Sequence, residues 1–171
     1  METSGMQPLL DLLNHPYLVR NRLAEQLYGR STTADHQRLK SRAAGRHRFR
    51  EEEVKGLVKI LLRLADKIDR RAQKLADLPL DGADNRVVYR LLDLPELTPK
   101  PLIDDALGPE RYFSFYDRAR QRGQVPDDWR QAVVAELRRF AGYLRQQCER
   151  TRLEARRYPF SYGMGGASHL K

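Results

Sequence analysis

The spacing of apolar residues along the chain predicts two long amphipathic helices. In residues 51–74 apolar side chains recur every three or four positions, which places them in one stripe on a helix: Val54, Leu57, Leu61, Leu64 and Ile68. Residues 126–157 repeat this spacing: Val133, Leu137, Phe140 and Leu144. No window alternates apolar and polar positions as a half-buried strand would. The pattern predicts an all-α fold that ends in a long helix.

Punctuating residues predict shorter helices between and before these two. A helix over residues 19–28 is expected to stop at Gly29, and Ser31 or Thr32 can cap a second helix over residues 33–44. Residues 76–101 contain five prolines and glycines around one short apolar run, so they predict a linker that carries one short helix. Residues 158–171 have three glycines and no periodicity, and they predict a tail.

The two halves of the chain resemble each other at offsets that fall in steps of three. At an offset of 82, Leu9–Leu12 matches Leu91–Leu94, with aspartate in the third place of both. At 79, Leu23, Ala24, Leu27, Tyr28 and Gly29 align with Leu102, Ile103, Ala106, Leu107 and Gly108, and at 76 the two apolar stripes above align. Leucine-rich helices also resemble each other by chance, so a true tandem duplication and a chance match both stay open.

Charge adds a preference for a polyanionic partner. The 171 residues include 32 Lys and Arg against 23 Asp and Glu, a formal net charge of +9. Residues 20–50 concentrate nine basic side chains against two acidic ones, Glu25 and Asp35: the bases are Arg20, Arg22, Arg30, Arg38, Lys40, Arg42, Arg46, Arg48 and Arg50. Such a concentration suits the phosphate backbone of DNA, although a merely solvated basic face is the simpler alternative.

The segment 18–68 resembles the Cro/repressor-type (XRE-like) helix-turn-helix superfamily. The resemblance is carried by Leu23-Ala24-Glu25-Gln26-Leu27 with Gly29 for the first helix of the motif, by the polar and basic positions 35–42 for its recognition helix, and by 52–64 for the helix behind it. It implies that the helix 33–44 enters the major groove of double-stranded DNA. In the degenerate second copy the turn would be Gly108-Pro109-Glu110, and the equivalent helix would run over residues 110–120.

Candidate contacts follow from side-chain chemistry. Four residues of the helix 33–44 have groups that bind base edges: Gln37, Arg38, Ser41 and Arg42. Six others suit phosphate contacts: Arg20, Arg30, Thr33, Lys40, Arg46 and Arg48. In the second copy the candidates are Arg111, Ser114, Arg118 and Arg120. Three aromatic residues beside them, Phe113, Phe115 and Tyr116, favour packing or subunit pairing over base contacts there.

Catalytic, metal and cofactor signatures are missing from the sequence. The four histidines are scattered, the acidic clusters lie at helix starts, and no glycine loop followed by Lys-Ser or Lys-Thr is present. We therefore expect no enzyme, no cofactor, no metal and no small-molecule substrate. The single cysteine, Cys148, and the absence of a signal peptide or a long apolar run predict a cytoplasmic, nucleoid-associated protein without a membrane partner.

The organisation expected from the sequence has four parts. These are a helix-turn-helix domain at 1–75, a linker with a short helix at 76–101, a second, degenerate helix-turn-helix-like domain at 102–157, and the tail at 158–171. The expected function is sequence-specific binding of double-stranded DNA, as a transcriptional regulator or a mobile-element factor, with homodimer or partner-protein contacts through the second domain. The alternative is a non-enzymatic interaction subunit of a nucleoprotein assembly that binds the DNA or RNA backbone without reading sequence.

Overall fold

A computed structural model describes residues 6–79, 85–120 and 125–157, with the side chains of residues 85, 86, 119 and 120 left out. These ranges contain no β-strand and eight α-helices: α1 (Gln7–Leu13), α2 (Arg20–Tyr28), α3 (Thr33–Ala43), α4 (Glu51–Ala76), α5 (Asn85–Leu92), α6 (Pro99–Leu107), α7 (Arg111–Arg120) and α8 (Asp127–Arg157). The all-α class and the long C-terminal helix predicted from the sequence are confirmed. The predicted tail at 158–171 lies outside the described residues.

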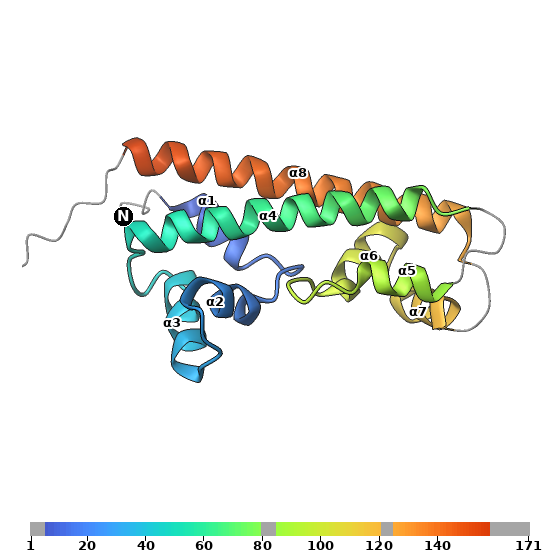
Figure 1. Cartoon of the computed structure of the whole chain (residues 1–171), viewed down its shortest axis with the longest axis horizontal. Helices are drawn as coiled ribbons and strands as arrows, with labels where there is room; N and C mark the ends of the chain where they lie inside the picture. Colours follow the sequence, from blue (N-terminus) through green and yellow to red (C-terminus); the bar gives the residue numbers. More distant parts are fainter. Residues whose placement is uncertain (1–5, 80–84, 121–124, 158–171) are drawn as a thin grey trace, which may run out of the picture.

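Two long helices form the upper layer of the molecule. Helices α4 and α8 pack against each other along their length and run in opposite directions (Figure 1). Their predicted apolar stripes face each other, because Leu57, Leu61, Leu64, Val133 and Leu144 all have at most 1% of their surface exposed. Burial of this paired stripe removes the largest apolar surfaces of the chain from water, which is the main driving force for the fold.

The short helices form a lower layer in two groups. Helices α2 and α3 lie under one end of the long pair, and α6 and α7 lie under the other end (Figure 1). Gly29 ends α2 with a φ of 69°, the left-handed conformation that glycine adopts without steric cost. The Thr32 hydroxyl then caps α3 by accepting a hydrogen bond from the Asp35 amide at 3.1 Å. The predicted helix end at Gly29 and one of the two predicted caps, Thr32, are therefore present.

Helix α1 lies at the same end of the molecule as α2 and α3, and α5 lies at the end of α6 and α7 (Figure 1). Helix α1 packs against α8, while α5 packs against α4 and α7. Helix α1 was not among the helices predicted from the sequence, since seven residues are too few for a clear period. The predicted linker contains α5, whose Val88, Leu91 and Leu92 are buried, and the first residues of α6. Its residues 80–84 lie outside the described part.

The segments that follow α1 and α5 meet in the middle of the molecule. Leu18 and Leu97 form an isolated antiparallel bridge. The Val19 amide donates to the Glu96 carbonyl at 2.9 Å, and the Thr98 amide donates to the Tyr17 carbonyl at 2.8 Å. The buried apolar side chains of both halves, from Met6 to Cys148, form one hydrophobic cluster. Both halves of the chain therefore contribute to one core.

Candidate nucleic-acid interface

Helix α3 carries all four of the predicted base contacts and two of the predicted phosphate contacts. Thr33, Gln37 and Lys40 are exposed at successive turns and form one stripe, and Arg38 and Ser41 flank it with partial exposure. On its other side α3 buries Leu39 and Ala43 against the core. The helix is thus held by an apolar face and displays a polar one, as a surface helix with a binding role would.

A shallow groove runs beside this stripe. It has a volume of about 300 Å³ and is lined by Ala34, Gln37, Arg38, Ser41, Arg42 and His47. All four predicted base-contacting residues therefore meet at one place, together with His47 from the segment after α3. Amide, hydroxyl and guanidinium groups around one groove offer both donors and acceptors of hydrogen bonds.

Arg42 is placed differently from the other three. Only 8% of its surface is exposed, its Nε atom lies 2.9 Å from Oε2 of Glu53, and its guanidinium also donates to the Arg48 carbonyl. A buried, paired guanidinium of this kind fastens α3 and the segment after it to α4. The prediction that Arg42 contacts a base receives no support from this placement, because the side chain already has its partners inside the protein.

Glu53 holds this region together. Its carboxylate accepts from the Tyr28 hydroxyl at 3.0 Å and from the Arg50 amide at 2.8 Å, and it pairs with Arg38 at 3.3 Å in addition to Arg42. Burial, and then the nearby Glu53 charge, raise the pKa of Tyr28, so its hydroxyl stays protonated as a donor. The sequence pattern places Glu53 only at the start of a helix. The signal for its larger role is its third position in that helix, where a carboxylate can also bind the chain before the helix.

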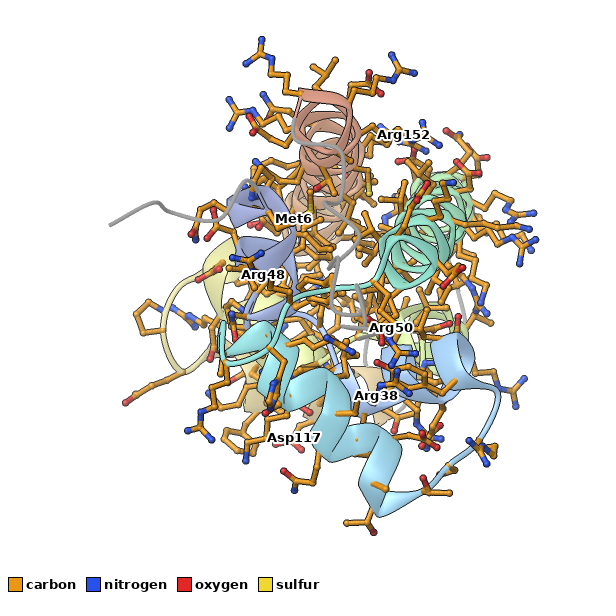
Figure 2. The ribbon with its side chains drawn as sticks, turned by 90° about the vertical axis from the view of Figure 1, so that its left-hand side faces the viewer. Met6, Arg38, Arg48, Arg50, Asp117 and Arg152 are labelled. Carbon is orange, nitrogen blue, oxygen red and sulfur yellow. The ribbon has the colours of Figure 1, made fainter. Side chains whose placement is uncertain are left out.

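Arg38 is anchored but still accessible. Its guanidinium carbon lies 4.8 Å from the centre of the Tyr28 ring, and 38% of its side chain is exposed. Figure 2 shows Arg38 and Arg50 in the region between α3 and the start of α4, with Arg48 on the segment that connects these helices. A guanidinium with one face on an aromatic ring keeps its edge donors available for a ligand.

The six predicted phosphate contacts divide into two groups. Thr33, Lys40, Arg46 and Arg48 are exposed, and among the described residues none of these three basic side chains forms an ion pair. The other two are engaged within the protein. Arg30 lies 3.9 Å from Asp35, and the half-buried Arg20 donates to Asn14 at 3.2 Å.

In the second half, three of the four candidates meet on α7. Arg111, Ser114 and Arg118 are exposed at positions spaced by three and four residues, which places them in one stripe. Both guanidinium groups lie over the ring of Trp129 at the start of α8, at 5.7 and 4.9 Å from its centre. The side chain of Arg120 lies outside the described residues.

The aromatic residues of α7 divide between core and surface. Phe115 and Tyr116 are buried, in agreement with the packing role that the sequence favours. Phe113 has 64% of its surface exposed, the largest exposure of any large apolar residue described.

One ionisable side chain, Tyr17, is also buried where the two halves meet. The Tyr17 hydroxyl, in a side chain with no exposed surface, bonds to Asp105 and to Glu136, the latter at 2.7 Å. The two carboxylates share the single hydroxyl, and burial raises the pKa of Tyr17 well above its usual range. A hydrogen bond from Arg139 lowers the pKa of Glu136. These contacts fasten the segment after α1 to α6 and α8, and none of them opens to a groove.

No family model, curated protein or solved structure was found to match the chain.

Other site chemistries find no counterpart in the described ranges. They contain no group of three or more His, Cys, Asp or Glu side chains that could hold a metal ion. None of the helices described there is both long and apolar enough to cross a bilayer. Cys148 is fully buried, and burial raises the pKa of its thiol to about 11, so the reactive thiolate is scarce at neutral pH.

Proposed function

We propose that the protein binds double-stranded DNA through α3 and reads sequence in the major groove with Gln37, Arg38 and Ser41. The observation that carries the proposal is the exposed stripe Thr33–Gln37–Lys40, which lies beside the groove lined by Gln37, Arg38 and Ser41. Amide and guanidinium groups recognise adenine and guanine edges, and Lys40, Arg46 and Arg48 are placed beside them for phosphates.

The local arrangement supports a helix-turn-helix assignment. Helices α2 and α3 pack against each other across the connection 29–32, and α4 packs behind α2. In the Cro/repressor-type superfamily that the sequence resembles, the second helix of the motif enters the groove, and here that helix is α3. A transcriptional regulator or a mobile-element factor are the biological roles that such a module would serve.

Affinity selection on fragmented source-genome DNA, with excess competitor DNA, tests the proposal. Enrichment of one sequence motif is the expected result, and the enriched duplex then serves for measurements with variants. Flat recovery would exclude sequence-specific binding and would leave only electrostatic contacts.

Two variants with matched controls locate the contacts. Gln37→Ala is expected to weaken binding of the enriched duplex by about tenfold or more and to relax specificity at one base pair, whereas Gln146→Ala on the exposed face of α8 should have no effect. Lys40→Ala should lower the slope of log affinity against log salt by about one, and Lys59→Ala on α4 should leave it unchanged. Equal behaviour of each variant and its control would reject α3 as the binding helix.

An interaction subunit that binds nucleic acid without reading sequence is the second candidate. It is favoured by one observation, the exposed Phe113 on α7, because a large exposed aromatic residue is typical of protein interfaces. This candidate predicts flat recovery in the selection, and it predicts that Phe113→Ser abolishes association with a protein partner.

A further inference from the structure

The contacts at the centre of the molecule are reciprocal. An offset of 79 carries Tyr17 to Glu96 and Val19 to Thr98, so it exchanges the two backbone hydrogen bonds that join these segments. The same offset carries Leu18 to Leu97, and these two residues form the bridge with each other. Residues paired with their own equivalents in an antiparallel bridge must lie next to an approximate two-fold axis.

Side-chain contacts obey the same relation. Gln26 donates to Oε1 of Glu96 at 2.9 Å, and Tyr17 donates to Asp105. The offset of 79 carries Gln26 to Asp105 as it carries Tyr17 to Glu96. The axis therefore exchanges these two contacts, although the side chains that make them differ. The helices obey the same relation: α1 packs against α8 and α5 packs against α4, so the axis exchanges α1 with α5 and α8 with α4.

The long helices cross near this axis. Arg145 of α8 pairs with Asp66 at 2.9 Å and with Asp69 at 2.5 Å, on either side of Ile68. Ile68 and its equivalent at an offset of 76, Leu144, are both fully buried. The antiparallel pair thus meets at equivalent positions, and its two ends are related by the two-fold axis.

The relation extends to the helices that carry the candidate contacts. The offset of 76 carries Glu53 to Trp129 and Arg42 to Arg118. Near the start of the long helix of each half, this residue contacts two arginines. Glu53 forms ion pairs with Arg38 and Arg42. The guanidinium groups of Arg111 and Arg118 lie over the ring of Trp129. Helix α7 therefore occupies in the second half the position of α3 in the first.

From this relation, and resting on the proposed function, we infer that α7 is a second DNA-contacting helix that binds the same duplex as α3. The contacts come from the exposed stripe Arg111, Ser114 and Arg118. At the offset of 76 these residues are the equivalents of Asp35, Arg38 and Arg42, while the equivalent of Gln37 is the exposed Phe113, so α7 would meet the duplex with a face next to the one that α3 uses. One chain would then do what two subunits of a symmetric dimer do, and its target would be a bipartite duplex with two unequal half-sites.

The charge of the stripe suits phosphate contacts. In the first half the Glu53 carboxylate offsets the charge of the arginines it holds. Trp129 is neutral, and Arg111 and Arg118 have no ion pair with any residue that the structure describes. Both positive charges therefore remain available on α7, with the Ser114 hydroxyl between them. We assign sequence reading to α3 and mainly phosphate binding to α7.

The spacing of the two helices suits successive major grooves. Fifteen residues separate Glu53 from Ile68 and Trp129 from Leu144, about 22 Å in each helix, so the two anchoring points lie about 45 Å apart. Both α3 and α7 lie on the same side of the long pair, one under each end (Figure 1). Major grooves on one face of DNA repeat every 34–36 Å, which is shorter than the distance of about 45 Å between the two anchoring points.

Duplex length separates this inference from the proposed function. We would measure the affinity of the full chain for a duplex of about 30 base pairs centred on the enriched motif and for one of about 14 base pairs that keeps only the half-site bound by α3. Hydroxyl-radical footprinting on the longer duplex should show two protected regions about one helical turn apart, on one face. Weaker binding of the shorter duplex is expected.

Variants on α7 complete the test. Ser114→Glu is expected to reduce affinity for the long duplex about tenfold and to leave the short duplex unaffected, while Gln146→Glu, which adds the same charge on α8, should change neither. Arg111→Ala combined with Arg118→Ala should lower the salt slope on the long duplex by about two. Circular dichroism verifies the fold of each variant.

Each outcome decides between defined alternatives. One protected region, equal affinity for both duplexes and equal effects of Ser114→Glu and Gln146→Glu would overturn the inference and leave the proposed function intact, with α7 free for a protein partner. Failure of the unmodified chain to bind either duplex would overturn both.

Discussion

The two halves of the molecule, α1–α4 and α5–α8, place different chemistry on equivalent positions. Near the start of its long helix the first half has the buried carboxylate of Glu53, while the second half has the aromatic ring of Trp129, and each holds two arginines. The Glu53 carboxylate compensates the charge of the arginines it pairs with, and one of them, Arg42, is buried. A ring holds guanidinium groups at the surface and leaves their charge in place. The same packing thus leaves guanidinium charge compensated by a carboxylate in one half and uncompensated in the other.

The starts of α3 and α7 differ in a similar way. Thr32 caps α3 through its hydroxyl, whereas Glu110, directly before α7, has a φ of 64° and is the only non-glycine residue with a positive φ in the described ranges. Left-handed backbone costs a residue with a Cβ atom about 1–2 kcal/mol. The first half begins its exposed helix with a stabilising contact, and the second begins it with a strained residue.

The largest difference between the halves is expected on replacing the two anchors. Glu53→Gln should lower the free energy of unfolding by about 3–5 kcal/mol, because it leaves the buried Arg42 without its counter-charge. Trp129→Leu keeps apolar bulk and loses two cation–π contacts near the surface, a cost of about 1–2 kcal/mol. Urea denaturation measures both values, and equal losses would contradict the contrast between a buried and a surface anchor.

Acid is expected to destabilise the first half through His15. Burial, and then the positive charge of Arg139, lower the pKa of His15, whose ring packs against Tyr17, Phe140 and Tyr143. His15 therefore binds a proton less readily in the folded protein than in the unfolded chain, where it titrates near pH 6.5, so stability falls as the pH drops below about 6.5. One group contributes less than about 1.4 kcal/mol per pH unit.

His15→Leu isolates this contribution, since the offset of 79 places Leu94 at the equivalent position of the second half. The variant should show a flatter dependence of unfolding free energy on pH just below about 6.5. Some loss of stability in acid remains in both proteins. The folded protein lowers the pKa of Glu96 and of Glu136, so the unfolded chain binds protons at these carboxylates more readily than the folded protein does. An unchanged slope would exclude His15 as the titrating group.

Changes at the starts of α3 and α7 should act in opposite directions. Thr32→Ala removes the cap and should cost about 1 kcal/mol of unfolding free energy. Glu110→Gly relieves the positive φ and should stabilise the protein by up to about 1 kcal/mol. Thermal denaturation of both variants gives the sign of each change, and destabilisation by Glu110→Gly would disprove the strain.

The smallest effect is expected at two helical glycines. A Cβ atom on Gly56 would lie 2.7 Å from Cδ1 of Leu27, where α2 approaches α4, while one on Gly142 of α8 would meet nothing within 4 Å. Alanine improves helix propensity at both places by about 0.5–1 kcal/mol. Gly142→Ala should therefore stabilise by that amount, and Gly56→Ala should gain less or lose stability. Equal gains in denaturation midpoint would show that Leu27 yields at no cost.

The sequence was sufficient to predict the two long helices with their buried apolar stripes and the pair of short helices α2 and α3, but not α1. Periods of three and four residues in α4 and α8 and the residues at Gly29 and Thr32 act within a few turns of chain, so their effects could be predicted locally. For the same reason, helical spacing alone places Thr33, Gln37 and Lys40 on one face of α3. It likewise places Arg111, Ser114 and Arg118 on one face of α7, and the structure shows both sets exposed.

Only the tertiary structure decided how these elements are used. Arg42 and Arg38 look alike in the sequence, but Glu53, eleven residues beyond Arg42, buries the first and leaves the second accessible. The packing of α1 on α8 joins segments more than 110 residues apart, and the pairing of Leu18 with Leu97 joins segments 79 residues apart. Local patterns cannot specify such contacts, because burial and charge pairing depend on which distant surface a side chain meets.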